Sequence, residues 1–232
     1  MAEPESTAAG YFGSMVEQYD SLIRRAVPRY DEMTDRLVEH LPWGPRRIVE
    51  LGCGTGNLTL RLARGFPDAE ILAVDAAPQM TDITARRAQE LPAGAARVRT
   101  ATARFEDFDA PPGSADLVTS CMSLHHVRDK SALYHAMAGW LQPGGTLAFA
   151  DQLLGATDRA QKLHWNLWLD FCRQPGHCTP EEVASLLEHS SAHDHYVAWP
   201  EHEAMLAAAG FVDVDCVWRI GMYTVVTAQR RP

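Results

Sequence analysis

Short apolar runs alternate along the chain with longer segments whose apolar residues recur every three or four positions. Runs that suit buried strands occur at 48–51, 70–75, 96–103, 116–121, 141–151, 212–218 and 222–229. Strands that alternate with helices indicate an α/β fold around a mainly parallel sheet. At 232 residues, the chain suits one such domain with a modest addition.

Two helical segments are additional to this alternation. Residues 10–41 contain two helical stretches interrupted at Pro28, and we expect an N-terminal cap over a ligand there. For the second stretch, a helix packed on the outer face of the sheet is an equal alternative. An insertion follows the fifth strand, and its second helix begins with the capping box Thr179-Pro-Glu-Glu182. We therefore expect a single domain, 1–232, with a helical cap at 10–41 and a helical lid at 152–199.

Composition narrows the class of protein. The chain is 46% hydrophobic and has no apolar run of the roughly 18 residues that a membrane span requires. Its N-terminus lacks the basic-then-apolar pattern of a signal peptide, and its five scattered cysteines fit neither a disulfide framework nor a zinc ribbon. We therefore expect a cytoplasmic protein, either a monomer or a homodimer. The net charge of −9 disfavours nucleic acid as a partner.

The first predicted strand runs into a glycine turn. Gly52, Gly54 and Gly56 follow it with one residue between each pair, and a helical pattern starts at once. A strand, a glycine turn and a helix in this order bind nucleotides at the helix N-terminus, because glycine lets the ligand approach the backbone. A dinucleotide fingerprint needs its third glycine at the sixth position, where this chain has Asn57. The second strand ends in Asp75, which is placed to accept hydrogen bonds from a ribose diol.

With Glu50 two residues before Gly52, the turn reads acid-x-Gly-x-Gly-x-Gly and resembles motif I of the class I S-adenosylmethionine (SAM) dependent methyltransferases. Three later features are similar to the same family in the same order. They are Asp75, the turn Leu124-His125-His126 after the fourth strand, and Gln142-Pro-Gly-Gly before the fifth. The resemblance implies a Rossmann-like sheet of seven strands with the last strand antiparallel, a helical cap, and SAM as the cofactor.

The resemblance also assigns residues to the cofactor. Met80 is placed to lie against the adenine, with core packing as the alternative. Arg104 stands where the family usually has an Asp that contacts the adenine, so we expect recognition by the backbone there, with packing by Phe105. The expected cofactor-binding residues are Tyr19, Tyr30, Glu50, Gly52, Cys53, Gly54, Gly56, Asp75, Ala76, Met80, Arg104, Phe105 and Cys121.

The segment 19–30 and the insertion are similar to a particular branch of the family, the carboxy-SAM synthases and some small-molecule methyltransferases. In the synthases, a tyrosine equivalent to Tyr30 contacts the cofactor, and an arginine in the insertion binds an extra carboxylate. No arginine occurs between Arg173 and Arg219. The resemblance therefore favours ordinary methyl transfer to an O, N or C atom of a small molecule.

Such a transfer needs alignment, exclusion of water and at most one proton acceptor. His126 is the first candidate and His125 the second, because their turn faces the cofactor. The alternative is that both histidines merely hydrogen-bond the turn. The segment 189–195 contains three histidines that could hold a metal, but no carboxylate–histidine motif of a known metal site is present, and we expect no metal.

Two other functions remain open. A closed, aromatic-rich cap could force SAM to react with itself and release methylthioadenosine, or support a carboxy-SAM type of transfer. A third hypothesis is a SAM-binding sensor without catalysis. The retained glycine turn, the acid at Asp75 and an enclosed acceptor space argue against that role.

Overall fold

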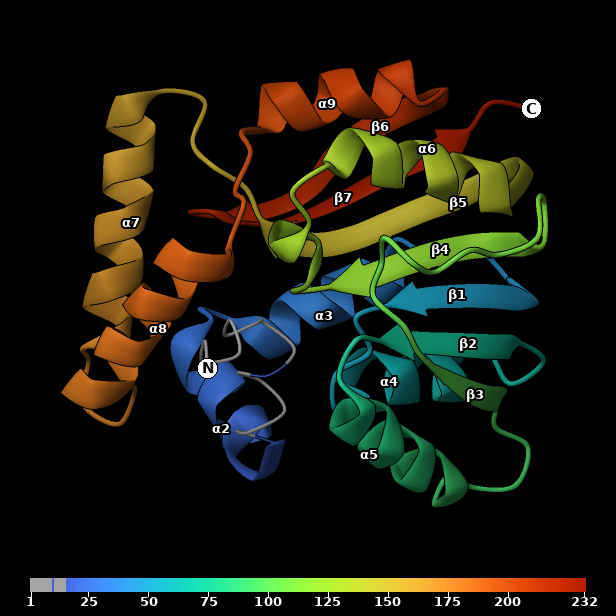
Figure 1. The fold of residues 1–232 in the computed structure, drawn as a ribbon, viewed down its shortest axis with the longest axis horizontal. Coiled ribbons are helices and arrows are strands. Elements are labelled where there is room, and N and C mark those ends of the chain that lie inside the picture. The colour runs from blue at the N-terminus through green and yellow to red at the C-terminus, as the bar shows by residue number, and fades with distance from the viewer. Residues whose placement is uncertain (1–9, 11–15) are drawn as a thin grey trace, which may run out of the picture.

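The computed structural model describes residue 10 and residues 16–232. Its centre is a seven-stranded sheet in the order β3-β2-β1-β4-β5-β7-β6 (Figure 1). β7 is antiparallel to both β5 and β6, and the other neighbouring strands are parallel. The predicted Rossmann-like sheet with an antiparallel last strand is therefore confirmed. The strands are β1 (Arg47–Leu51), β2 (Glu70–Asp75), β3 (Arg97–Thr102), β4 (Ala115–Cys121), β5 (Leu141–Gln152), β6 (Phe211–Ile220) and β7 (Tyr223–Arg230).

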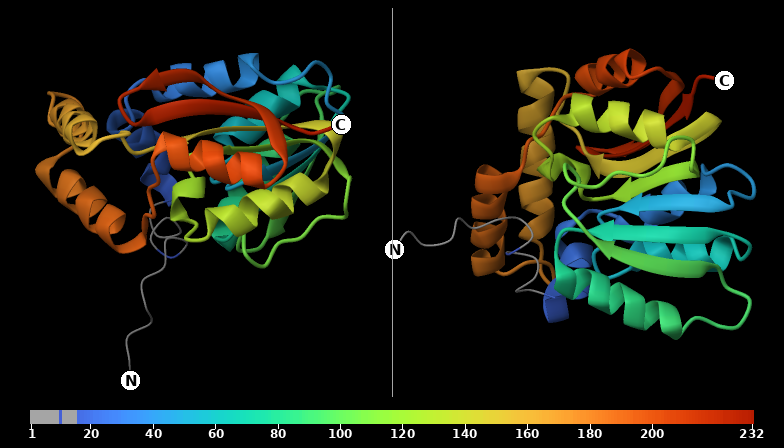
Figure 2. Two further views of the ribbon diagram at one scale, coloured as in Figure 1. Left: turned by 90° about the horizontal axis from the view of Figure 1, so that it is seen from above. Right: turned by 45° about the vertical axis from the view of Figure 1, so that its right-hand side comes forward.

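Helices cover both faces of this sheet, as the view from above shows (Figure 2). α3 and α4 pack on one face, and α6 and α9 pack on the other. Among the described residues, no helix is both long enough and apolar enough to span a bilayer. The helices are α2 (Val16–Ala26), α3 (Tyr30–Glu39), α4 (Asn57–Gly65), α5 (Pro78–Gln89), α6 (Lys130–Trp140), α7 (Asp158–Cys172), α8 (Pro180–His193) and α9 (Trp199–Ala208), with a short 3-10 turn, η1 (Leu124–His126).

Each face of the sheet has its own apolar core. Met33 and Leu37 of α3 are fully buried against the face that α4 also covers, and Tyr134 of α6 and Phe149 of β5 are buried in the other. Full burial of one such side chain stabilises the fold by about 1.5–3 kcal/mol. The two cores hold the sheet rigid, so the ends of the parallel strands form a fixed platform.

The carboxyl ends of the parallel strands point toward α2, α7 and α8 (Figure 1). α3 instead contacts β5 and β7. The second stretch of the expected cap is therefore a helix packed on the sheet, which was the alternative given from the sequence. Of the expected cap at 10–41, α2 is the described helix at this edge of the sheet, and residues 11–15 lie outside the described residues.

The insertion contributes α7 and α8. The Thr179 capping box is formed at the start of α8, with Thr179 Oγ1 accepting from Glu182 N at 3.2 Å and Glu182 Oε2 accepting from Thr179 N at 2.8 Å. On α7, the buried Trp168 donates its indole N–H to Ala26 O of α2 at 2.9 Å. Leu163 and Leu167, on another side of α7, face solvent and are 57% and 53% exposed. Trp168 therefore attaches the insertion to α2.

Candidate active site

The glycine turn after β1 is shaped by the turn after β4. Gly52, Gly54 and Gly56 have φ angles of 72°, 52° and 89°, which favour glycine over residues with a Cβ. A Cβ on Gly52 would lie 2.0 Å from Ser123 Oγ, whose hydroxyl donates to Leu51 O at 3.2 Å. Glycine at position 52 is therefore required by the close approach of these two turns.

Asp75 lies at the end of β2 and supports the glycine turn. Its carboxylate accepts hydrogen bonds from Gly54 N and Ala77 N, both at 2.9 Å. Burial raises the pKa of this carboxyl, and the hydrogen bonds from Ala77 and Gly54 oppose the rise. Asp75 also lines a cavity, so it both braces the turn and presents a carboxylate to a ligand.

A cavity of about 370 Å³ opens at the carboxyl ends of β1, β2 and β4, and a small recess adjoins it beneath the glycine turn. Gly56 lies outside both linings and packs against Thr84 of α5. Met80 is 2% exposed and lines the cavity, so its side chain is buried in the protein and also forms part of the cavity wall. The other expected cofactor residues all line these two spaces: Tyr19, Gly52, Gly54, Asp75, Ala76, Arg104 and Phe105 in the cavity, and Tyr30, Glu50, Cys53 and Cys121 in the recess.

Glu50, the acid of the glycine motif, is buried in the recess. Its residue is 1% exposed, and this burial raises the pKa of its carboxyl to about 7. A glutamate in the unfolded chain titrates near 4.3. The folded protein therefore holds a proton on Glu50 at pH values where the unfolded chain has released it.

Glu50→Gln is expected to flatten the pH dependence of stability. Because the pKa of Glu50 is raised in the folded state, its contribution to the free energy of unfolding is most favourable below about pH 4.3. As the pH rises to about 7, the wild-type protein loses up to about 3 kcal/mol of this free energy. Glutamine cannot ionise, so the free energy of unfolding of the variant should rise relative to that of wild type by a similar amount between about pH 5 and about pH 8. Urea unfolding at the two pH values measures the difference. Parallel losses of unfolding free energy in the two proteins would show that Glu50 does not titrate in this range.

α2 is fastened to the glycine turn by Asp20. Thr55 Oγ1 donates to its carboxylate at 2.5 Å, Asn57 Nδ2 donates at 3.0 Å, and Arg87 forms an ion pair at 2.7 Å. Asn57 occupies the position that departs from the dinucleotide pattern. Its side chain therefore has a defined role in attaching α2 over the turn.

Asp20→Ala is expected to loosen α2. Removing one carboxylate that accepts charge-assisted hydrogen bonds costs about 1–2 kcal/mol. This loss corresponds to amide hydrogen exchange in α2 that is about 5–30 times faster. Asp82→Ala makes the same change at an exposed position in α5 and should leave the α2 rates unchanged. An α2 that exchanges at the wild-type rate in Asp20→Ala would mean that these contacts do not hold it.

α2 is also joined to the insertion. Arg25 forms a two-pronged ion pair with Glu182 of α8, with distances of 2.7 and 2.6 Å, and donates to His177 O at 2.8 Å. Together with Asp20 and the indole of Trp168, this pair connects the glycine turn, α2, α7 and α8. The helices at this edge of the sheet form one connected cover.

A second cavity lies beneath this cover. Leu22, Ile23, Trp168 and Leu186 form part of its apolar wall. Its polar end is formed by His125, Gln152, His189, Ser190 and Asp194. Tyr19 and Met122 line this cavity and the first one, so the two are neighbours. Met122 has a φ of 56°, a left-handed conformation that a non-glycine residue rarely adopts and that is often found at functional sites.

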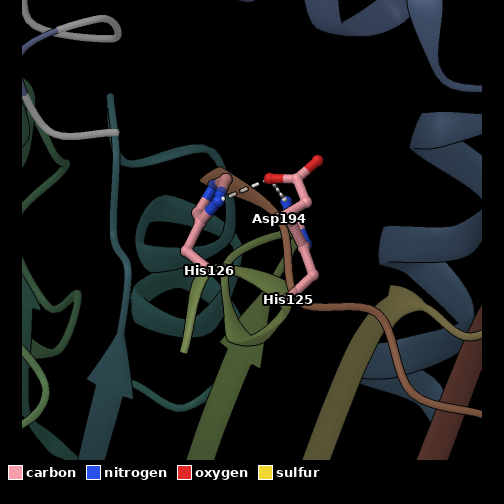
Figure 3. Close-up of side chains that lie close together, drawn as sticks. All are labelled: His125, His126 and Asp194. Carbon is pink, nitrogen blue, oxygen red and sulfur yellow. Dashed lines mark ion pairs between the residues drawn. The ribbon is translucent and has the colours of Figure 1, made fainter. Parts of the chain in front are cut away.

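The two expected catalytic histidines lie on η1, between the cavities. His126 lines the first cavity and His125 the second. Asp151 accepts from His125 N at 2.9 Å and contacts its Nδ1 at 2.5 Å, while His126 Nδ1 lies 2.9 Å from Asp194 Oδ1 (Figure 3). Both carboxylates were missed as site residues. Asp151 could have been found from the sequence, because it lies near the end of a predicted strand, as Asp75 does at the end of another.

Burial and charge act differently on the two imidazoles. Burial lowers the pKa of His126 to about 4, and the neighbouring His125 adds to this effect. Burial also acts to lower the pKa of His125, but the charge of Asp151 and the hydrogen bond to it prevail and raise the pKa above its ordinary value. His126 is therefore a neutral imidazole near pH 7, able to accept a proton or to offer a lone pair.

A family model described as a methyltransferase domain matches residues 48–145, from β1 into β5. The matched segment contains the glycine turn, Asp75 and the η1 histidines. The chain therefore contains a methyltransferase domain, and its seven-stranded sheet has the fold of the class I SAM-dependent methyltransferases. The recognition made from the glycine motif and the later turns is thus confirmed for the methyltransferase domain, and SAM is the cofactor of that class. The finer likeness to carboxy-SAM synthases stays a prediction.

Among curated relatives of this methyltransferase, a trans-aconitate 2-methyltransferase of Streptomyces coelicolor is 33% identical over 191 residues, which are 81% of this chain and 59% of that protein. A malonyl-[acyl-carrier protein] O-methyltransferase of Halorhodospira halophila is 33% identical over 60% of this chain and 45% of its own length. The chain spans about half the length of the curated relatives it matches.

Solved structures share the fold. A phosphoethanolamine N-methyltransferase of Haemonchus contortus, in complex with phosphomonomethylethanolamine and S-adenosylhomocysteine, has a TM-score of 0.71 at 14% identity, covering 98% of this chain and 61% of that one. A putative methyltransferase of Haloferax volcanii, in complex with the activator Trm112, has a TM-score of 0.69 at 16% identity and covers both chains completely. At these identities the likeness concerns the fold alone.

The residues of the first cavity fit SAM. Gly52 and Gly54 expose backbone at the cavity wall, and a side chain on Gly52 would meet Ser123. The buried carboxylates of Glu50 and Asp75 match a cofactor that carries a sulfonium and an ammonium group. The family assignment and the shape of the methyltransferase's own residues therefore agree.

Proposed function

We propose that this methyltransferase transfers the methyl group of SAM to an O, N or C atom of a small molecule held in the second cavity. The observation that carries the proposal is the adjacency of the two cavities, which share Tyr19 and Met122. A cofactor bound against Gly52, Asp75 and Met80 would have the acceptor as its neighbour. The cover of α2, α7 and α8 would limit the access of water to the junction.

SAM supplies an activated methyl group with its own leaving group, so the protein mainly has to align the reactants. Asp75 would orient the ribose, Met80 and Phe105 would pack on the adenine, and Glu50 and Tyr30 line the recess that would hold the methionine part. The rigid sheet fixes all of these positions. His125 and His126 stand where a proton of the acceptor has to be removed.

The lining of the second cavity favours an acceptor with an apolar or aromatic body. Leu22, Ile23, Trp168 and Leu186 offer apolar surface, and none of the described residues that line this cavity is Lys or Arg. Among these residues, a free carboxylate would meet the carboxylate of Asp194 without a lysine or arginine to balance it. The acids named for the curated relatives are therefore poor models for this chain's acceptor, and a neutral phenol, enol or amine is the better match.

Product analysis by mass spectrometry tests the reaction. Purified enzyme and SAM without an acceptor should leave most of the SAM intact. Addition of a panel of neutral phenols, enols and amines should give S-adenosylhomocysteine and a methylated product in equal amounts. Release of methylthioadenosine without an acceptor would instead support self-reaction of SAM. Tight SAM binding with no turnover across the panel would favour a sensor, and both results would contradict methyl transfer.

A further inference from the structure

Three imidazoles and one carboxylate meet at the junction of the two cavities. Asp194, in the loop after α8, directs Oδ1 toward His126 Nδ1 at 2.9 Å, His189 Nε2 at 3.6 Å and His125 Nε2 at 3.9 Å. The side chains are 4%, 16%, 5% and 7% exposed in that order. Segments more than sixty residues apart in sequence thus gather four metal-ligating side chains in one buried place.

Further contacts orient the members of this cluster. Asp151 holds Nδ1 of His125, so the Nε2 lone pair of a neutral His125 faces Asp194. The second oxygen of Asp194 accepts from the Tyr196 hydroxyl at 2.5 Å, which leaves Oδ1 directed at the imidazoles (Figure 3). A carboxylate behind a ligating histidine is the usual arrangement around protein-bound metal ions.

The electrostatic environment is suited to a cation. Two buried carboxylates, Asp151 and Asp194, lie beside the imidazoles, and the buried ammonium of Lys130 donates to Val127 O and His195 O.

We propose that His125, His126 and Asp194 bind one divalent transition-metal ion, with His189 in reach as a fourth ligand. In a tetrahedral zinc site with bonds of about 2.0–2.1 Å, neighbouring ligand atoms lie about 3.3 Å apart. The distances from Asp194 Oδ1, from 2.9 to 3.9 Å, bracket this value. Small side-chain rotations are enough to complete the site. The sequence argued against a metal because it contains no carboxylate–histidine motif of a known metal site. The ligands proposed here come from separate segments, which a local motif does not reveal.

The place of the ion suggests its use, which rests on the proposed function. An acceptor hydroxyl at this junction would lose its proton more readily beside a divalent cation. The proton passes to solvent, the oxygen forms a bond to the methyl carbon, and the bond from that carbon to sulfur breaks. The products are a methyl ether, S-adenosylhomocysteine and one proton. His126 then acts as a ligand and not as the proton acceptor.

Titration with the metal alone tests the site. Chelator-treated protein is titrated with Zn²⁺ in a calorimeter and with Co²⁺ in a spectrophotometer, where tetrahedral Co²⁺ shows strong visible bands. We expect one ion per chain. Asp151→Asn, which disturbs the orientation of His125, should weaken binding by about 10–100-fold, and Asp194→Asn should weaken it further.

The controls separate this site from adventitious binding. His135→Ala removes an exposed histidine of α6 and should bind the metal as wild type does. Asp194 does not line the first cavity, so Asp194→Asn should bind SAM with unchanged affinity, which reports both its folding and the cofactor site. A wild-type protein that takes up no ion, or an Asp194→Asn protein that binds it equally well, would overturn the proposal. Either result would leave SAM binding and methyl transfer in place, with His126 as the proton acceptor.

Discussion

Gly52→Ala should lower the free energy of unfolding by about 2–4 kcal/mol and weaken SAM binding at least about tenfold. The φ of 72° costs a non-glycine residue about 1–2 kcal/mol. The added Cβ would also lie 2.0 Å from Ser123 Oγ and 2.4 Å from Ser123 Cβ. Ser123 is held by Ser120 Oγ at 2.8 Å and by Leu51 O, so it cannot move away without loss. Urea unfolding and calorimetric titration with SAM measure the two effects.

Gly139→Ala is the matched control. Gly139 lies in α6, has no positive φ, and has no atom within 4 Å of the added Cβ. The same chemical change there should be neutral or stabilise the protein by up to about 1 kcal/mol, because alanine favours helix. Equal losses in the two variants would show that position 52 has no special conformational requirement.

Asp75→Ala should weaken SAM binding by about 1–3 kcal/mol, which is about 5–150-fold in affinity. The carboxylate is expected to accept charge-assisted hydrogen bonds from the ribose. It also accepts from Gly54 N and Ala77 N, so its loss relaxes the glycine turn as well. Calorimetry with SAM on the folded variant gives the difference directly.

Asp82→Ala tests whether the loss is local. Asp82 is exposed on α5 and does not line the cavity. The net charge changes equally in both variants, so a long-range effect of charge would appear in both. An unchanged affinity in Asp75→Ala would remove Asp75 from the cofactor site.

Local patterns predicted most of the sheet. Each of the seven strands lies within two residues of the run that predicted it, and the signal was strongest at β1 and β2, whose buried positions are mainly apolar. The glycine turn and Asp75 were also readable, since they adjoin a strand end where the chain itself fixes their positions. Twelve of the thirteen expected cofactor residues line the cavity or the recess for this reason.

Contacts between distant segments could not be predicted. Nothing near Asp20 in the sequence indicates Asn57 or Arg87, and nothing near His126 indicates Asp194. The Asp20 contacts require α2 to lie over the glycine turn, and the His126–Asp194 contact requires the loop after α8 to lie beside η1. The position of α3 was open for the same reason, because its apolar stripe suits either a cap or the face of a sheet.

The central claim is that SAM occupies the cavity between Gly52, Asp75 and Met80, beside the acceptor space. A crystal structure of the protein with S-adenosylhomocysteine tests it most directly. We predict ribose hydroxyls hydrogen-bonded to Asp75, the adenine between Met80 and Phe105, and the sulfur facing Met122 at the opening to the second cavity. A nucleoside bound elsewhere, or bound here without contact to Asp75, would contradict the claim.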